Sequence, residues 1–215
     1  MCPDSCIPTN PGQYPSDCEV LEGYRAMARN QPASPIRSAA WQAALSKAKP
    51  IRILLLDVDG VLTDGSLIYS HEGQESKAFN TQDGFGLRLL QEAGLELGVI
   101  TARSSEAVAK RCANLKMHYV YQGVGNKVEA YKEILKQSGC KPFEIAYMGD
   151  DWLDLVLLTR AGFSAAPANA VPEIQEAVHY TTEQSGGHGA VREICNLILE
   201  AKGQYRQLLQ SYMSR

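Results

Sequence analysis

Two carboxylates separated by one residue follow a short, continuous apolar segment. Asp57 and Asp59 come directly after residues 51–56, and Gly60 beside them permits a tight turn. A calcium loop of the EF-hand type does not fit, because its twelfth position requires a bidentate Glu and residue 68 is Ile. An isolated Asp-x-Asp pair is usually a surface turn, but its place after an apolar strand makes this pattern far more specific.

A second acidic group follows another apolar segment. Asp150, Asp151 and Asp154 come after residues 145–148. Carboxylates this close repel one another unless a cation joins them. Helix capping explains one of the three at most, so the spacing favours a metal site.

Thr101 and Lys127 are ambiguous when each is taken alone. Thr101 ends the apolar segment 95–100, where a Thr is usually a helix cap, although its hydroxyl can equally bind a phosphate oxygen. Lys127 begins a helical pattern, and a single Lys is normally a solvated surface residue. Their place relative to the carboxylates decides between these alternatives.

The elements that would position these residues alternate along the chain from residue 51. Strand-like segments cover 51–56, 95–100, 119–121, 145–148 and 163–165, and helical patterns cover 86–92, 105–115, 127–137, 151–159, 171–177 and 190–201. This alternation predicts an α/β protein with a Rossmann-like three-layer fold and a central parallel sheet. Ligands bind such sheets at the carboxyl ends of the strands, where Asp57, Thr101, Gln122 and Asp150 stand.

One segment breaks the alternation. Residues 66–69 and 75–80 flank a His-Glu-Gly turn at 71–73, between the first strand and the first helix. This pattern predicts a small β-hairpin flap.

The first 50 residues differ in composition from the rest. They hold seven of the ten prolines. We expect an N-terminal extension over 1–50, irregular or disordered at 1–18 and with short helices at 19–29 and 36–49. The main folded domain is then expected over 51–203, with a C-terminal tail over 204–215.

Charge and composition exclude several classes of protein. The net charge is −3, which offers no basic surface for nucleic acid or an anionic membrane. The apolar segments are too short to span a membrane. No signal-peptide pattern precedes the six cysteines. We therefore expect reduced thiols and a cytoplasmic location.

The four motifs, in this order, resemble those of the haloacid dehalogenase superfamily of phosphotransferases over residues 51–203. Three segments narrow the resemblance: the predicted hairpin with Lys77, residues 83–86, and the Gly-rich stretch 186–193. They resemble the small capless subgroup of 3-deoxy-D-manno-octulosonate 8-phosphate phosphatases, which act in lipopolysaccharide biosynthesis. Ala102 stands where that family commonly has Gly. Residues 1–50 lie outside the resemblance.

The resemblance implies a role for each motif. Asp57 is the expected nucleophile that forms an aspartyl-phosphate, and Asp59 is the general acid and then the general base. Thr101 and Lys127 would hold the phosphoryl oxygens. Mg²⁺ is the implied cofactor, held by Asp57, Asp150 and the Asp59 backbone carbonyl, with Asp151 and Asp154 orienting these ligands.

The resemblance also implies a substrate with a carboxylate and therefore an arginine at the mouth of the site. Arg103 is the main candidate, and Arg111, Asp83 and Gly84 are further candidates for substrate binding. In this family the hairpin and the C-terminal segment cover the site of an adjacent subunit, so we expect a homotetramer.

Three alternatives to this interpretation remain at this stage. Phosphatases of nine-carbon sialic-type acid 9-phosphates carry a Glu where this chain has Arg103. A non-catalytic domain of the same fold would not need Lys127 together with the carboxylates. A receiver domain phosphorylated on Asp57 would lack Asp59 as an acid.

Overall fold

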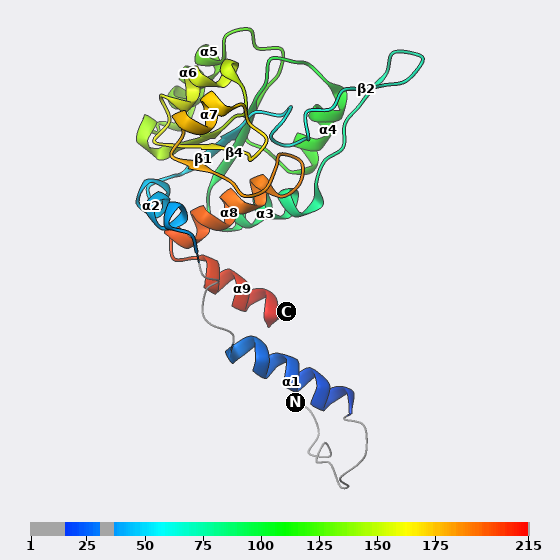
Figure 1. Ribbon diagram of the computed structural model, residues 1–215, viewed down its shortest axis with the longest axis vertical. Helices are drawn as coiled ribbons and strands as arrows, with labels where there is room; N and C mark the ends of the chain where they lie inside the picture. The colour runs from blue at the N-terminus through cyan, green and yellow to red at the C-terminus, as the bar shows by residue number, and fades with distance from the viewer. Residues whose placement is uncertain (1–15, 31–36, 215) are drawn as a thin grey trace. The chain divides into compact units, whose positions relative to one another are not determined.

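The computed structural model describes residues 16–30 and 37–214. The chain divides into two units, residues 1–38 and 39–215. The first contains helix α1 (Asp17–Asn30), over the segment where a short helix is expected at 19–29. The expectation for residues 1–15 lies outside the described residues. The second unit holds all the candidate site residues (Figure 1).

The second unit is built on a sheet of six parallel strands. Their order is β5 (Tyr119–Tyr121), β4 (Glu96–Ile100), β1 (Ile53–Leu56), β6 (Ile145–Met148), β7 (Phe163–Ala166) and β8 (Tyr180–Thr181). The central strand β1 is buried along its whole length. Five of these strands match the predicted ones. The two-residue β8 was not predicted, because so short a strand carries no pattern.

Helices cover both faces of the sheet, which confirms the three-layer prediction. Leu54 and Leu56 face a cluster that includes α2 (Ala39–Ala48), α3 (Thr81–Glu92), α4 (Glu106–Asn114) and α8 (Ala190–Ala201). Ile53 and Leu55 face α5 (Lys127–Ser138), α6 (Leu155–Leu158) and α7 (Pro172–Ala177). This alternation follows from the two-residue period of a strand.

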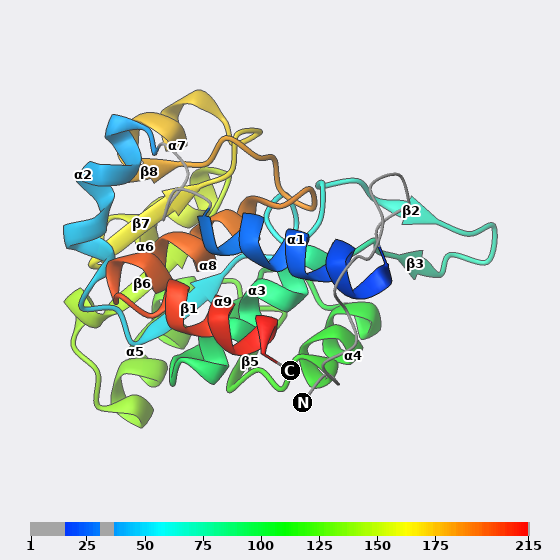
Figure 2. The ribbon, with the colours of Figure 1, turned by 90° about the horizontal axis from the view of Figure 1, so that it is seen from below.

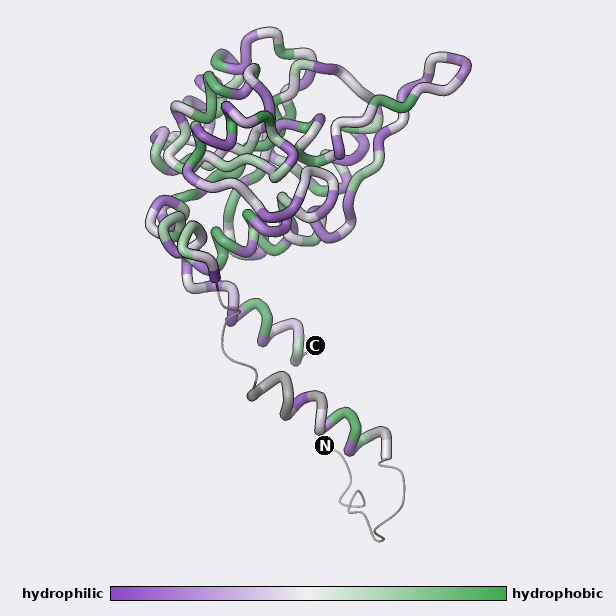
Figure 3. The backbone as a smooth tube through the Cα atoms, in the orientation of Figure 1, coloured by the Kyte–Doolittle hydropathy of each residue, from purple (hydrophilic) through white to green (hydrophobic). Residues whose placement is uncertain are grey.

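The predicted hairpin flap is present. It consists of β2 (Ile68–Tyr69) and β3 (Glu75–Ser76), paired antiparallel. It projects from the sheet in both ribbon views (Figures 1 and 2), and its tip is hydrophilic (Figure 3). Among the described residues, no separate cap domain accompanies it.

Both ends of the second unit are helical. Helix α2 lies within the segment expected to be an N-terminal extension, yet Trp41, Ala44 and Ala48 are buried in the core. Helix α9 (Tyr205–Met213) lies in the segment expected to be a tail, and Tyr205 and Tyr212 pack against the same core. Within the described part of the chain, no helix has the length and apolarity to cross a membrane.

Helix α3 begins earlier than its predicted start at residue 86. Asn80 caps it by accepting hydrogen bonds from the backbone N–H groups of Gln82 and Asp83. Gly84 and Gly86 weaken the helical pattern of this turn. A Cβ atom at Gly86 would lie 2.8 Å from Arg192 Cδ of α8, so Gly86 allows the two helices to pack closely.

Candidate active site

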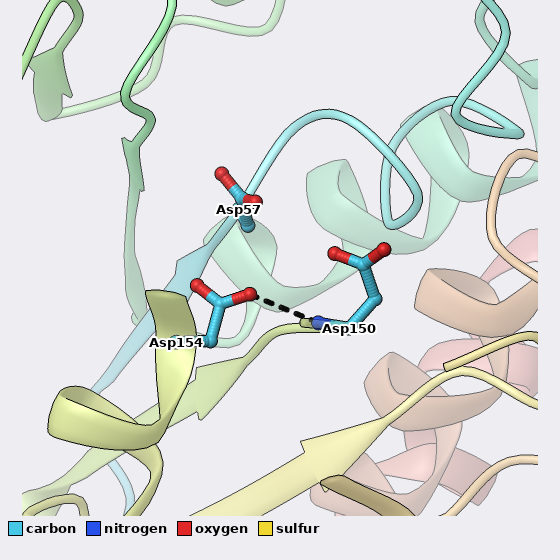
Figure 4. Close-up of side chains that lie close together, drawn as sticks. All are labelled: Asp57, Asp150 and Asp154. Atoms are coloured by element: carbon cyan, nitrogen blue, oxygen red, sulfur yellow. Dashed lines mark hydrogen bonds between the residues drawn. The ribbon is translucent and has the colours of Figure 1, made fainter. Parts of the chain in front are cut away.

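Three carboxylates meet at the carboxyl ends of β1 and β6 (Figure 4). The Asp57 backbone N–H donates to Met148 O at 2.9 Å, which extends the pairing of the two strands. Asp150 follows β6, and Asp154 lies in a short 3₁₀ helix (Trp152–Asp154). Each of the three side chains offers an oxygen within 4.8 Å of the others.

Asp154 is wholly buried, and hydrogen bonds occupy both of its oxygens. Oδ1 accepts from Lys127 Nζ at 2.7 Å and from the Tyr147 hydroxyl at 2.5 Å. Oδ2 accepts from the backbone N–H groups of Asp150 at 3.0 Å and Asp151 at 3.3 Å. With its lone pairs used in this way, Asp154 has little capacity left for a cation, and Asp57 and Asp150 are the two carboxylates of the cluster that could hold one.

Lys127 is a buried residue of the site, which decides against the solvated-surface alternative. It is the first residue of α5, whose N-cap is Asn126. Its side chain is 5% exposed, and Nζ lies 3.1 Å from Asp57 Oδ1. Burial alone would lower the pKa of Lys127, but Asp57 and Asp154 outweigh it and raise that pKa. The ammonium therefore stays charged beside Asp57.

Burial and mutual repulsion make the ionised forms of Asp57 and Asp150 less stable than those of exposed carboxylates. Burial, with repulsion from Asp154, raises the pKa of Asp57 to about 6. Burial, with repulsion from Asp154 and then Asp57, raises the pKa of Asp150 to about 7. Asp57 Oδ1 is buried and accepts no well-aligned hydrogen bond, although Lys127 is close to it. One ammonium, Lys127, stands against three carboxylates, and the remaining negative charge fits Mg²⁺, a hard cation that prefers oxygen ligands.

Gly60 makes room for Asp150. Its φ is +80°, and a Cβ atom there would lie 2.0 Å from Asp150 Oδ2. Asn169 links the loop after β1 to the Gly-rich stretch. Its side chain donates to Gly60 O at 3.3 Å and accepts from Gly186 N at 2.6 Å. The Gly-rich stretch thus packs on this chain's own Asp57 loop. Asn169 was not predicted, because it lies far from every motif in the sequence.

Thr101 lies at the same edge of the sheet. It is buried at the end of β4, the strand beside β1. Its backbone N–H donates to Tyr121 O at 2.9 Å, and its carbonyl accepts from Val124 N at 3.1 Å. These bonds fix Thr101 on the strand next to Asp57, as the strand order requires.

Known proteins share much of this sequence and its fold. A family model of haloacid dehalogenase-like hydrolases matches residues 117–194. The chain is 42% identical over 160 residues to the 3-deoxy-D-manno-octulosonate 8-phosphate phosphatase KdsC of Escherichia coli K12, covering 74% of this chain and 85% of that protein. This chain belongs to the 3-deoxy-D-manno-octulosonate 8-phosphate phosphatase family of haloacid dehalogenase-like hydrolases.

Solved structures of the phosphatase family have the same fold. The Yersinia pestis enzyme superposes with a TM-score of 0.75 at 39% identity, covering 76% of this chain and 89% of that one. The Moraxella catarrhalis enzyme superposes with a TM-score of 0.77 at 39% identity, covering 79% and 97%. The latter structure contains magnesium, phosphate and the sugar acid KDO.

Two cations lie beside Asp59 in this family member, Lys77 of the hairpin and Arg103 after β4. Arg103 donates to Glu75 Oε2 at 2.6 Å and to the Tyr69 hydroxyl at 2.8 Å, and its Nε lies 3.6 Å from Asp59 Oδ2. Lys77 pairs with Asp59 Oδ1 and lies 3.2 Å from Glu75 Oε1. Asp59 and Arg103 were predicted site residues. Lys77 was noted only as part of the hairpin sequence that resembles the family, and no spacing rule links it to Asp59.

Of the other predicted substrate-binding residues, Asp83 and Gly84 lie at the start of α3, and Arg111 of α4 lies against that start. Asp83 is buried and accepts from the backbone N–H of Arg192 at 2.7 Å and of Gly189 at 3.4 Å, at the first turn of α8. Arg111 donates to Asn80 O at 3.0 Å, and a Cβ atom at Gly84 would lie 2.2 Å from its Nη2. These contacts favour a structural role for Asp83 and Gly84.

A cavity of about 210 Å³ opens beside Lys127. Its lining includes Ala102, Asn126 and Trp152. Trp152 is 61% exposed, which is unusual for so large an apolar side chain. The exposed Trp152 ring therefore gives this cavity an apolar surface close to the buried Lys127.

Proposed function

We propose that this chain is a Mg²⁺-dependent phosphatase that hydrolyses 3-deoxy-D-manno-octulosonate 8-phosphate to the free sugar acid and phosphate, in the cytoplasm and in lipopolysaccharide biosynthesis. The observation that carries the proposal is the buried Asp57–Lys127 pair beside Asp150, in a chain 42% identical to enzymes of that name. Phosphoryl transfer needs a nucleophile and positive charge around the phosphoryl oxygens, and this cluster supplies both.

The residues divide the reaction into two steps. A carboxylate oxygen of Asp57 attacks phosphorus, the bond from phosphorus to the sugar oxygen breaks, and the Asp59 carboxyl gives its proton to that leaving oxygen. Water then attacks the phosphorus of the aspartyl-phosphate and gives a proton to Asp59. Phosphate leaves, and the Asp57 carboxylate is restored.

The remaining residues stabilise charge. Lys127 and Thr101 hold the phosphoryl oxygens, and Lys127 also keeps Asp57 ionised. Asp57, Asp150 and the Asp59 backbone carbonyl would hold Mg²⁺, which when bound neutralises charge on the phosphoryl group. Asp154, through its four hydrogen bonds, keeps Lys127 and Asp150 in place, with Asp151 beside it.

Arg103 is the residue we assign to the substrate carboxylate. Its side chain is 42% exposed and stands beside Asp59, so a bound sugar acid can reach it. Arg111 is the second candidate from the sequence. The curated relatives favour the eight-carbon acid, because they carry that substrate in their names.

The test is phosphate release with Mg²⁺ from a panel that includes the eight-carbon and nine-carbon keto-acid phosphates. We expect a strong preference for the eight-carbon acid, lost with EDTA and in Asp57→Asn. Preference for the nine-carbon acid would keep the mechanism and overturn the role of Arg103. If the folded protein releases phosphate from no substrate, the proposal that it is a phosphatase is wrong.

We also propose a homotetramer. The hairpin exposes Leu67, Ile68 and Tyr69, an apolar group that a neighbouring subunit would cover. Sedimentation velocity at micromolar concentration is expected to give a single species of four chains. A monomer under those conditions would refute this assembly.

A further inference from the structure

Lys77 is the one Lys or Arg of the hairpin segment 66–80 and has no role in the mechanism above. It lies just beyond β3, and its side chain is only 1% exposed. Its ammonium pairs with Asp59 Oδ1 and lies 3.2 Å from Glu75 Oε1. A buried ammonium is stable only beside compensating anions, so these two contacts fix where Lys77 lies.

The pair is part of a closed network that joins the hairpin to the Asp57 loop. Lys77 faces one oxygen of Asp59, and Arg103 faces the other at 3.6 Å. Glu75 holds both cations, through Oε1 to Lys77 and Oε2 to Arg103 at 2.6 Å. Two cations and two anions thus neutralise one another, and both oxygens of Asp59 are held by residues tied to the hairpin.

We propose that Lys77 is a positioning residue, which holds the Asp59 carboxyl group toward the leaving oxygen of the substrate. This rests on the proposed function only in that Asp59 acts as the proton donor. Lys77 does not bind the substrate itself, because its side chain is almost inaccessible. Proton transfer requires a heavy-atom separation of about 2.6–3.2 Å, so a carboxyl free to rotate would lose much of its effect.

The test uses substrates that differ in their need for an acid. Phenyl phosphate and 4-nitrophenyl phosphate have nearly the same shape, but nitrophenolate is a far weaker base and leaves without a proton. The ratio kcat/KM reports the steps up to phosphoryl transfer, so the later hydrolysis does not mask the effect. The variants are Lys77→Met and Asp59→Asn, with exposed Lys132→Met on α5 as the matched control.

We expect Lys77→Met to follow Asp59→Asn. The loss in kcat/KM is expected to be about 10²-fold or more with phenyl phosphate and with the sugar-acid phosphate, and at least about tenfold smaller with 4-nitrophenyl phosphate. Most of the loss should fall on kcat. Lys77→Arg, which keeps the charge, is expected to recover part of the activity, and Lys132→Met to leave all substrates unaffected.

Two results would overturn the proposal. An equal loss with both aryl phosphates, in a variant whose circular dichroism matches the wild type, would show a general structural effect. No loss with any substrate would show that Asp59 needs no such support. Failure of the wild type on the sugar-acid phosphate would reject the proposed substrate instead, and the aryl pair would still decide the role of Lys77.

Discussion

Asp154 has no access to solvent, and yet it sets the arrangement of the groups around it. One of its oxygens binds two side chains, those of Lys127 and Tyr147, and the other binds two backbone N–H groups. The negative charge of Asp154 holds Lys127 in the interior and at the same time raises the pKa of Asp57 and Asp150.

Replacing Asp154 with Asn should damage the site through its neighbours. The amide nitrogen would face a donor and would leave the Lys127 charge poorly compensated. We expect Mg²⁺ affinity to fall about 10–100-fold and the free energy of unfolding to fall by about 1–3 kcal/mol. Calorimetric Mg²⁺ titration and urea unfolding measure the two effects.

Asp151→Asn is the comparison for that variant. Asp151 is exposed and accepts a hydrogen bond from the Trp152 backbone N–H at 2.7 Å. We expect a clearly smaller loss of affinity. Equal losses in the two variants would show that burial of Asp154 does not matter.

The raised pKa values of Asp57 and Asp150 predict a pH-dependent response to Mg²⁺. The metal-free folded chain keeps these protons up to about pH 6 and 7, above the ordinary value of 3.8. Their contribution to stability is therefore lost as the pH rises from about 4 to 7, and Mg²⁺ restores it once the groups are ionised.

Thermal unfolding at two pH values measures this response. With Mg²⁺ at about 100 times its Kd, we expect Tm to rise by roughly 5–10 °C at pH 8, and by much less at pH 5. Asp150→Asn should remove most of the rise. A rise of the same size at both pH values would contradict the assignment of these ligands.

At the scale of elements, the loop after β1 depends on one glycine. Gly60→Ala is expected to cost about 1–2 kcal/mol for the left-handed backbone and to push Asp150 away, with an activity loss of about 10²-fold. Gly73→Ala at the hairpin tip is the matched control, because φ is again +80° and no atom lies within 4 Å of the new Cβ. Activity and urea unfolding of both variants separate the backbone cost from the clash.

Helix α8 depends on Asp83 of α3 for its first N–H groups. Asp83→Ala leaves the N–H groups of Arg192 and Gly189 without this acceptor and is expected to cost about 1–3 kcal/mol of unfolding free energy. KM for the sugar-acid phosphate should not change. A raised KM with unchanged stability would instead support the substrate-binding hypothesis for this residue.

The sequence predicted the elements that consist of continuous patterns and missed contacts between distant ones. The apolar segments before Asp57, Thr101 and Asp150 are strands, because only a central sheet buries such segments on both faces. The start of α3 was missed because its glycines serve packing against Arg111 and α8. The contact of Lys77 with Asp59 spans 18 residues through the hairpin, and no periodicity reports on it.

At the scale of the molecule, α2 belongs to the folded unit. Trp41 is 3% exposed and packs edge-on against Tyr180 of β8. We expect a variant without residues 1–38 to keep the stability and activity of the whole chain. Removal of 1–50 should cost at least about 3–5 kcal/mol, the usual effect of losing a buried Trp side chain. Urea unfolding and activity of the two truncated proteins test this boundary, and equal stability would refute it.

The two tryptophans of the chain offer separate optical signals. Trp41 is enclosed in the core, whereas Trp152 stands in water at the mouth of the cavity beside Lys127. A dissolved quencher such as iodide reaches Trp152 and not Trp41 while the chain is folded. The quenched part of the emission therefore follows whatever covers the site, and the protected part follows the opening of the core. One fluorescence titration can distinguish occupation of the site from loss of the fold without an added label.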